Sequence, residues 1–579
     1  MPNMSTGDQI FALDTILAHS RKKKKGLVCA FLDISKAFDS VRHADIYRTM
    51  RDRGISSDSI GMLQAMYYEG RSRIIVNEHL TEQIDIKKGV RQGGISSPLC
   101  FNFIPDVLAR KIDESNLGIR LRKNGPRIGI LLYADDIVLI ARNIGHLQLL
   151  CDITCAWAYE FSLSINIAKS IWIDYRKKLT DQSLRLGGLK LERVDKFKCL
   201  GKFTEKRLEK KTDQKLTLEK MKTACRAVQG INSGLKSLPI VRRAVIAEAH
   251  TVSTALYAKE CMQSDWDQKL LDLLERERMK IARTLLNAPK GIARETSLED
   301  LGWITIRNHW RKRVLTFRKR VLGSRSVIMK EIVRANRDEE LPWERNCTSL
   351  LNQFELNEFL DKERITSLEK RKWELMLTNK VSALNLKEVL HRLKTETERT
   401  TRLWRWLKDG ATFSFIPTFM RFNLDRQLAA GAIHRLRAGF NYSNYNAYIR
   451  HLVPSGKCGT CDVDETEEHM LEVCPRFGPL RARLEKELEQ LQVPLRQFRL
   501  MEITLYGNRF EEFLKTLEEE RGVALIADID RHIKMFHEGI LKAKMKELEA
   551  KKGATATGAT EGKVNRQKSL DSWIITKNP

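Results

Sequence analysis

Two adjacent aspartates interrupt an apolar run in the segment ILLYADDIVLIA, residues 130–141. The flanking residues predict two short strands, 128–133 and 137–141, with Ala134, Asp135 and Asp136 at the turn between them. Two carboxylates at one buried turn repel each other and raise a pKa, unless a divalent cation neutralises them. The alternative is an ordinary exposed hairpin tip, which needs only one good turn former. The pattern alone leaves both interpretations open.

A further carboxylate ends another apolar segment. Asp33 closes the predicted strand GLVCAFLDI, residues 26–34, at a place where a sheet presents side chains to a cleft. Asp39, six residues later, has the more usual roles of a lone aspartate, a cap or an ion pair. Phosphoryl transfer between nucleotides uses two Mg²⁺ ions, about 3.5–4 Å apart, held by carboxylates. If Asp33 and Asp135 lie on adjacent strands, we expect them to hold such ions.

A third group of residues has metal-ligand spacing. The segment CGTCDVDETEEHMLEVC contains Cys458, Cys461, His469 and Cys474 in a C-x2-C-x7-H-x4-C pattern. Three thiolates and one imidazole suit a closed, tetrahedral structural Zn²⁺ site, with the first two cysteines in a knuckle and the other ligands on a short helix. Two disulfides are the alternative, but the embedded histidine and the scatter of the other cysteines argue against them.

The composition indicates a polyanionic partner. The chain has 579 residues, too many for one core, and its 102 Lys and Arg against 74 Asp and Glu give a net charge of +28 and a pI near 9.6. Nucleic acid is the expected partner before a membrane surface, and a merely soluble basic protein is the alternative. No apolar stretch reaches the roughly 18 residues of a transmembrane helix, and the N-terminus does not resemble a signal peptide.

The elements that must position these residues fall into two kinds. Residues 1–200 mix strands, including a pair at 72–77 and 82–90, with helices at 97–114 and 146–163. From about 205, long amphipathic, charge-rich helices predominate. Basic and aromatic residues gather at 401–410 and 434–452, and the Gly/Ala/Thr-rich segment 551–563 is typical of disorder.

Five segments occur in a specific order: FLDISKAFDSV, KKGVRQGGISSPLCFNF, YADDIVLIA, FSLSINIAKS and FKCLGK. Together they resemble the successive palm motifs of reverse transcriptases, and most closely those of non-LTR (LINE-type) retrotransposons. The resemblance is strong over residues 5–205 and weaker to about 540. It implies an RNA-directed DNA polymerase that uses two Mg²⁺ ions and dNTPs to extend a DNA primer, or nicked target DNA, on an RNA template.

The resemblance also assigns roles by position. Asp33 and Asp135 resemble the metal ligands, and Asp136 the supporting carboxylate. Phe38 resembles the steric gate that selects dNTPs, with a core aromatic as its alternative. The other implied substrate-binding residues are Gln92 and Gly93 beside the incoming nucleotide and template, Lys169 near the triphosphate, and Leu200 and Gly201 in the primer grip.

The implied fold is α+β: a right-hand polymerase palm and partial fingers with an antiparallel sheet, then a helical thumb, a helical linker and a small C-terminal zinc-binding module. The expected domains are 1–31 as a remnant of the fingers or a connector, 32–205 as palm, 206–330 as thumb, 331–455 as basic linker, 456–480 as zinc module, 481–550 as C-terminal helices and 551–579 as a disordered tail. Fingers motifs and an endonuclease domain are expected ahead of Asp33 and are not found, so the chain resembles the C-terminal part of a longer protein. A catalytically inactive, nucleic-acid-binding remnant is the alternative function.

The zinc segment resembles the one near the C-terminal end of LINE-type polyproteins, which is thought to bind the element's RNA or target DNA. Charged and aromatic residues before it suit phosphate contacts and base stacking, with plain packing as the alternative for the tyrosines. These residues are Arg435, Arg437, Tyr442, Tyr445 and Arg450.

Two short segments suggest further partners. The tail segment RQKSLDSWI resembles the peptide that docks on the replication sliding clamp, although its last position is usually aromatic; the matching residues are Gln567, Leu570, Trp573 and Ile574. The run RKKKKG, residues 21–26, is interpreted as a solvated connector or a nuclear-localisation run. We expect the protein in the nucleus, with a cytoplasmic ribonucleoprotein phase.

Overall fold

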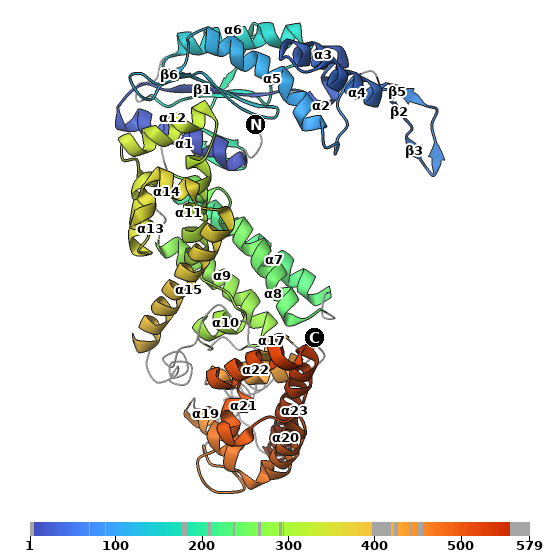
Figure 1. Cartoon of the computed structure of the whole chain (residues 1–579), viewed down its shortest axis with the longest axis vertical. Helices are drawn as coiled ribbons and strands as arrows, with labels where there is room; N and C mark the ends of the chain where they lie inside the picture. Colours follow the sequence, from blue (N-terminus) through green and yellow to red (C-terminus); the bar gives the residue numbers. More distant parts are fainter. Residues whose placement is uncertain are drawn as a thin grey trace. The chain divides into compact units, whose positions relative to one another are not determined.

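The chain divides into two compact units, which are described one at a time (Figure 1). Unit 1 comprises Met1–Asp213, Ala258–Asp265 and Val314–Ser367, and unit 2 comprises Gln214–Tyr257, Trp266–Arg313 and Leu368–Pro579. The computed structural model describes residues 5–555 except 69, 87, 177–181, 206–209, 235–237, 264–267, 289–291, 293, 396–417, 422–426, 439–442 and 450–454.

A five-stranded sheet of order β13-β10-β1-β9-β8 forms the centre of unit 1. Its middle strand, β1 (Val28–Asp33), pairs antiparallel with both β9 (Asp136–Ala141) and β10 (Ile171–Asp174). β8 (Ile130–Tyr133) extends the antiparallel order at one edge, and β13 (Glu192–Arg193) joins β10 in parallel at the other. The strand predicted at 26–34 and the hairpin predicted at 128–141 are therefore neighbours in one sheet.

Elements on both faces bury β1. α5 (Ser97–Glu114) and α6 (Ile144–Glu160) pack on the face from which alternate residues of β1 join a large apolar cluster. On the other face Phe31 packs against Phe197, with ring centroids 5.0 Å apart, and α1 (Thr6–Lys22) contacts β8. Figure 1 shows α5 and α6 on one side of the sheet and α1 on the other. A strand covered on both faces is nearly all apolar, as the sequence of β1 is.

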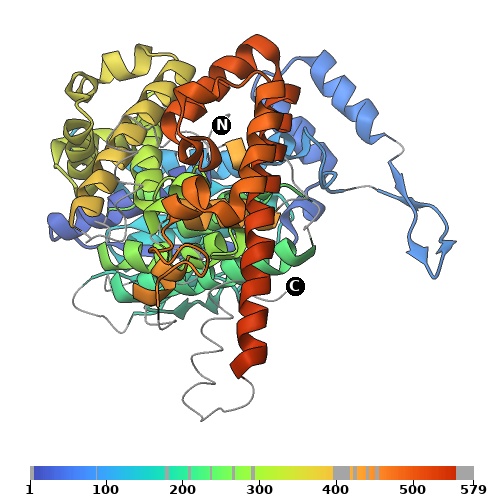
Figure 2. The ribbon, with the colours of Figure 1, turned by 90° about the horizontal axis from the view of Figure 1, so that it is seen from below.

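Smaller elements complete unit 1. Residues 71–85 form a two-step hairpin that projects from the unit, in place of the longer strand pair predicted at 72–77 and 82–90 (Figure 2). The remaining strands are β2 (Arg71–Ser72), β3 (Ile75–Val76), β4 (His79–Leu80), β5 (Ile84–Asp85), β6 (Ile119–Arg120), β7 (Arg127–Ile128), β11 (Arg185–Leu186), β12 (Leu189–Lys190), β14 (Lys196–Cys199) and β15 (Lys202–Glu205). The remaining helices are α2 (Ala37–Ser40), α3 (His43–Asp52), α4 (Ser57–Tyr67), η1 (Lys259–Cys261), α12 (Val327–Asp338), α13 (Pro342–Gln353), η2 (Asn357–Leu360) and α14 (Lys362–Ser367).

The ends of unit 1 differ from the expected domain division. The segment 1–31, expected as a remnant of the fingers or a connector, contains α1, which is largely buried and whose Phe11 packs on Phe317 and Trp343 with ring centroids 5.2 and 4.6 Å apart. Residues 314–367, divided by the sequence between a thumb (206–330) and a linker (331–455), pack in unit 1. Helical periodicity shows that a helix has an apolar face but does not show which distant segment covers it.

Unit 2 is helical, and its helices pack around one apolar cluster whose residues range from Met221 to Leu541. The cluster includes residues from the segments predicted as thumb, zinc module (456–480) and C-terminal helices (481–550), so these segments share a core. α23 continues to Thr555, beyond the predicted start of a disordered tail at 551. The elements of unit 2 are α8 (Ile240–Ala255), α9 (Gln268–Leu285), α10 (Arg294–Asp300), α15 (Lys370–Thr395), α17 (Thr418–Arg421), α18 (Gln427–Arg437), α19 (Asn444–Ile449), η3 (His469–Val473), η4 (Pro475–Phe477), α20 (Gly478–Gln490), η5 (Leu495–Gln497), α21 (Leu500–Thr504), α22 (Asn508–Arg521) and α23 (Val523–Thr555).

Two long helices, α7 (Lys210–Gly234) and α11 (Ile306–Leu322), each contribute residues to both units. Within the part of the chain that the structure describes, no helix combines the length and the apolar character needed to cross a membrane.

Candidate active site and candidate metal centre

Backbone pairing brings the predicted aspartates together at one end of the sheet. Asp33, the last residue of β1, lies directly opposite Asp136, the first residue of β9. Tyr133 and Asp136 close the hairpin, so Ala134 and Asp135 form its two-residue turn. Ala134 has a φ of 52°, a conformation that alanine rarely adopts. The sequence predicted that Asp33 and Asp135 meet, and the register shows that Asp136 is the cross-strand partner of Asp33.

The three carboxylates form a negatively charged group that suits a divalent cation. Each side chain is half-buried, so the exposed hairpin tip is not what the structure shows. Burial raises the pKa of Asp136, and the negative charges of Asp135 and Asp33 raise it further. In the described part of the chain, none of the three has an ion pair with a basic side chain. Carboxylates with no protein counter-charge are the ligands that Mg²⁺ prefers, so the residues fit that ion.

A short turn holds the end of β1 in place. Asn166 donates its backbone N–H to the Asp33 carbonyl at 2.8 Å, and the Asp33 N–H donates to Ser170 Oγ at 3.2 Å. The Ser170 hydroxyl in turn donates to the Asn166 carbonyl at 2.7 Å. Lys169, which the motif resemblance assigned to the triphosphate, is exposed on this turn, whereas the roles of Asn166 and Ser170 were not predicted. Their signal was a pair of polar residues inside the motif FSLSINIAKS.

Phe38 is half-buried beside the core rather than free in the site. Its ring stacks on Phe101 with centroids 4.6 Å apart and an interplanar angle of 19°. Its carbonyl accepts the N–H of Val90 at 2.8 Å, which ties the segment after Asp33 to the segment that carries Gln92. The packing role that was the alternative for Phe38 is therefore present, and the structure does not test its role as a gate.

A pocket of about 180 Å³ lies between these two segments. Gln92 lines it and donates from Nε2 to Asp39 Oδ1 at 3.2 Å. Gly89 has a φ of 89°, and a Cβ at this position would come within 3.0–3.2 Å of the Asp39 backbone. Gly93, with a φ of 82°, faces open space. The other lining residues are Tyr67, Gly70, Ile86, Lys88, Val90 and Arg91.

Leu200 and Gly201 form the tip of the β14–β15 hairpin. Both have positive φ, 47° and 79°, as a type I′ turn requires, although leucine adopts this conformation rarely. Burial raises the pKa of the adjacent Cys199 to about 12, and the charge of Asp136 adds to this rise. The contact of Phe31 with Phe197 places β14 against β1, and the primer-grip role of Leu200 and Gly201 stays a prediction.

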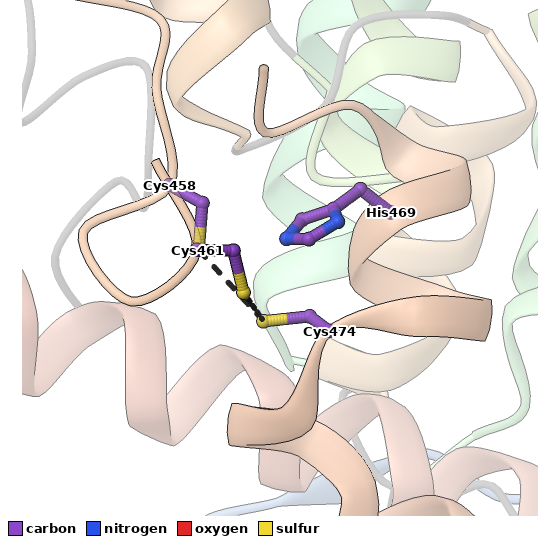
Figure 3. Close-up of side chains that lie close together, drawn as sticks. All are labelled: Cys458, Cys461, His469 and Cys474. Carbon is purple, nitrogen blue, oxygen red and sulfur yellow. Dashed lines mark hydrogen bonds between the residues drawn. The ribbon is translucent and has the colours of Figure 1, made fainter. Parts of the chain in front are cut away.

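The four predicted zinc ligands converge in unit 2 (Figure 3). The ligand atoms of Cys458, Cys461, His469 and Cys474 all lie within 4.8 Å of one another. The Sγ atoms of Cys458 and Cys461 lie 3.8 and 3.9 Å from that of Cys474, so these cysteines are free thiols rather than disulfides. Four ligands with metal–sulfur bonds of about 2.3 Å in a tetrahedron place sulfur atoms roughly 3.8 Å apart. The three aspartates of unit 1 do not form a group this tight.

Local backbone structure explains the convergence. Cys458 and Cys461 lie on a tight loop, closed by the Cys458 N–H donating to the Val463 carbonyl at 2.7 Å. His469 and Cys474 bracket η3, a π-helical turn in which the Cys474 N–H donates to the His469 carbonyl at 2.7 Å. On an α-helix, residues five apart point about 140° away from each other, so the wider π turn is what aligns them.

The surroundings of the group also fit a metal. His469 Nε2 is buried and has no hydrogen-bond partner. Burial raises the pKa of Cys474 to about 11, whereas backbone N–H groups of Thr460 and Cys461 outweigh the effect of burial at Cys458 and lower its pKa. A buried nitrogen acceptor facing three thiols is a set of ligands that could hold a metal ion such as Zn²⁺.

The structure corrects the expectation that Arg435 and Arg437 contact phosphates. Arg437 is buried and donates to Asp300 Oδ1 and Glu299 Oε1, both at 2.9 Å, as well as to two backbone carbonyls. Arg435 is also buried and donates to the Asn287 carbonyl. Because their donors are used inside unit 2, these arginines fix helices rather than bind nucleic acid. The exposed Tyr445 is untested, and Tyr442, Arg450 and the clamp-like residues Gln567, Leu570, Trp573 and Ile574 lie outside the described residues.

A comparison with known families decides the identity of the N-terminal part. The family described as "Reverse transcriptase (RNA-dependent DNA polymerase)" matches residues 1–228. Residues 1–228 are therefore similar to a reverse transcriptase domain. The central sheet, the three aspartates and the β14–β15 hairpin all lie within it.

Relatives of this reverse transcriptase domain come from retrotransposable elements. The Pol polyprotein of the type-2 element R2DM of Drosophila melanogaster is 30% identical over 35% of this chain and 20% of its own length. A Pol polyprotein of the type-1 element R2 of Nasonia vitripennis is 35% identical over 24% of this chain and 13% of its own length. The RNA-directed DNA polymerase of the mobile element jockey of Drosophila funebris is 23% identical over 35% of this chain and 22% of its own length. The chain therefore spans about a fifth or less of these first relatives.

Among solved structures, telomerase from Candida albicans in complex with a fragment of telomeric RNA matches 49% of this chain and 51% of that chain at 10% identity. The TM-score of this match is 0.30.

Proposed function

We propose that this chain is an RNA-directed DNA polymerase of a non-LTR retrotransposon, which extends a DNA 3′-hydroxyl on an RNA template with dNTPs. The observation that carries the proposal is the pairing of Asp33 with Asp136, with Asp135 at the adjoining turn, inside a reverse transcriptase domain. These half-buried carboxylates lack protein counter-charges and therefore fit two Mg²⁺ ions. Mg²⁺ bound there supplies Lewis-acid stabilisation of the reacting phosphate and of the 3′-oxygen.

The residues around the aspartates position the reactants. Asn166 and Ser170 hold the end of β1, so the Asp33 carboxylate keeps a fixed direction. The stack on Phe101 holds the Phe38 ring in one orientation, which supports the proposal that this ring excludes a ribose 2′-hydroxyl. Gln92 lines the pocket and Gly93 has open space beside it, which supports their assignment to the nucleotide and template. The exposed position of Lys169 supports its assignment to the triphosphate. The turn at Leu200 and Gly201 supports the primer end.

For the four clustered residues of unit 2, Cys458, Cys461, His469 and Cys474, we propose a structural Zn²⁺ site. Its ligands Cys458 and Cys474 belong to the apolar cluster of unit 2, so a Zn²⁺ ion there would join the knuckle to the helices around it. Binding of the sliding clamp through residues 567–574 stays a prediction.

Primer extension by the full chain tests the proposal. An RNA template annealed to a DNA primer, with Mg²⁺ and dNTPs, should give extended product, and NTPs should not. Asp135→Asn should lower the extension rate by roughly 10³-fold, because removing a charge that is used mainly in the transition state costs several kcal/mol.

Asp58→Asn is the matched control. Asp58 is an exposed aspartate in the first turn of α4, and its loss should leave the rate within about 2-fold. Equal rates for wild type and Asp135→Asn would refute the metal-ligand role. Absence of extension in the wild type, with RNA binding retained, would favour the alternative of an inactive nucleic-acid-binding remnant.

A further inference from the structure

A basic surface lies at the end of the central sheet that is opposite the aspartates. β1 runs from Val28 to Asp33, and its first residue pairs with Ala141 and Asp174, the last residues of β9 and β10. The loops that enter or leave the sheet here are therefore separated from Asp33 by the length of the strand, roughly 17 Å for five residue steps. We call the surface the rear basic surface and define it by Lys24, Lys25, Arg120, Lys123, Arg127 and Arg142.

Arg142 joins the two segments that build this surface. Its guanidinium donates to the Arg120 carbonyl at 3.0 Å and to the Gly26 carbonyl at 3.5 Å. The chains approach closely here, because a Cβ on Gly26 would lie 2.8 Å from the Arg142 carbonyl oxygen. The Arg142 guanidinium therefore bridges the backbone at the end of the lysine run and the backbone of β6. The lysine run and the β6–β7 hairpin thus form one continuous surface.

The lysine run is folded rather than extended. The N–H of Lys23 donates to the His19 carbonyl at 2.9 Å, and the N–H of Lys25 donates to the Ser20 carbonyl at 3.0 Å. Lys24 between them has a φ of 53°. A nuclear-localisation signal that is read as an extended peptide would first have to unfold this turn. The fixed turn instead presents exposed ammonium groups in a defined place, which suits a rigid polyanion.

The charges on this surface are not balanced by the protein. Nearby carboxylates are already paired with other cations: Glu339 with Lys22 and Lys23, Glu331 with Arg122, and Asp174 with Arg176. The six residues of the rear basic surface have no ion pair in the described part of the chain.

The β6–β7 hairpin adds a local repulsion. Arg120 and Arg127 are exposed and directly opposite each other, so two like charges share one face of a two-strand ladder. Like charges in this position destabilise a hairpin, and the repulsion disappears when phosphates lie between them.

We propose that the rear basic surface binds the phosphodiester backbone of a nucleic acid, at a site separate from the template and primer at the aspartates. Phosphate contacts by Lys and Arg supply affinity without base recognition, so the ligand class is a folded RNA or a DNA duplex. Such a site would hold a second region of nucleic acid on unit 1 while the sheet's other end engages the 3′-hydroxyl. It does not depend on polymerase activity.

A charge-removal variant of the full chain tests this site. The variant carries Lys24→Gln, Lys25→Gln, Arg120→Gln and Arg127→Gln. Its matched control removes four exposed cations of unit 1 that lie on four different elements, through Arg51→Gln, Lys190→Gln, Arg345→Gln and Lys362→Gln. Both lose the same net charge. Removing the repulsion between Arg120 and Arg127 should stabilise the hairpin, so the variant is expected to fold.

Binding is measured with a folded hairpin RNA and with a DNA duplex, between about 50 and 300 mM salt. We expect the dissociation constant of the rear variant for one of them to rise at least ~10-fold above that of the control, with a salt slope smaller by about 3. Whichever nucleic acid, the RNA or the DNA, loses more affinity in the rear variant is the one whose phosphates the surface binds. Equal affinity and slope for variant and control with both ligands would overturn the proposal.

Two further readouts separate this site from the polymerase site. Bound nucleic acid should protect Lys24 and Lys25 from acetylation, while Lys190 and Lys362 should stay reactive; unprotected Lys24 and Lys25 would overturn the proposal. Extension of a short annealed primer should stay within about 2-fold of wild type in the rear variant. If the wild type extends no primer but the rear variant binds nucleic acid more weakly than its control, the polymerase function is refuted and the rear site is supported.

Discussion

Asp136 carries a charge that the folded protein alone does not favour. Burial and the charges of Asp135 and Asp33 raise its pKa above the usual value of 3.8. A carboxyl whose pKa is higher in the folded state than in the unfolded chain lowers stability as the pH rises through both values. The penalty is therefore fully present near neutral pH, and a divalent cation removes it.

The raised pKa of Asp136 predicts how the free energy of unfolding changes when no metal is bound. In EDTA near pH 7, Asp136→Asn should have a higher free energy of unfolding than wild type, because the repelling charge is gone. The difference should shrink as the pH falls through the raised folded-state pKa of Asp136, because the wild-type carboxyl is then protonated too. Urea unfolding midpoints at several pH values measure it, with Asp58→Asn as the control. Added Mg²⁺ should stabilise wild type more than Asp136→Asn. A variant that is less stable than wild type in EDTA would contradict the charge argument.

At the scale of elements, close backbone contact sets the distance between α2 and the segment before α5. The N–H of Gly89 donates to the Val41 carbonyl at 2.7 Å, and the N–H of Val90 donates to the Phe38 carbonyl at 2.8 Å. The positive φ of Gly89 and the nearby Asp39 backbone leave no room for a side chain. The pocket that contains Gln92 depends on this contact.

Gly89→Ala should therefore disturb the pocket. We expect a loss of about 1–3 kcal/mol in the free energy of unfolding from the strained φ and the contact with Asp39, and a higher KM for dNTPs in primer extension. Gly61→Ala is the matched control, because Gly61 lies in helix α4 with no neighbour within 4 Å. That change should stabilise by about 0.5–1 kcal/mol and leave KM unchanged. Equal KM values for the two variants would show that the contact does not shape the pocket.

Elements with a strong local signal were predictable from the sequence. The helix predicted at 97–114 matches α5 residue for residue, and the hairpin around Asp135 is confirmed. The zinc group was predictable because its ligands follow a fixed spacing. Two other features could not be predicted: the hydrogen bonds of Asn166 and Ser170 to the end of β1, and the burial of Arg437 against Asp300. Both depend on contacts between segments more than 130 residues apart.

At the scale of the whole molecule, the two units have separate cores, and only unit 2 contains the zinc group. The free energy of metal binding is folding free energy for the elements that the metal joins. Loss of zinc should therefore destabilise unit 2 and leave the sheet of unit 1 intact.

Cys458→Ser combined with Cys461→Ser tests this. We expect about one equivalent of zinc in wild type and none in the variant, together with faster hydrogen exchange at 456–480 and unchanged exchange at 28–33. Cys155→Ser removes a half-buried thiol of unit 1 and should keep the zinc. Retention of one zinc by the double variant would show that these cysteines are not its ligands.

The order of strands in the sheet has a consequence for synthesis on the ribosome. β1 is the first strand to be made, yet both strands that flank it come from residues 136–174. At about 5–20 residues per second, the nascent chain carries β1 for roughly 7–28 s before β10 is complete. Until β9 is complete, roughly 5–22 s after β1, the apolar segment Val28–Leu32 has no native strand partner in the sheet. We therefore expect nascent chains to expose this segment to chaperones until the later strands emerge.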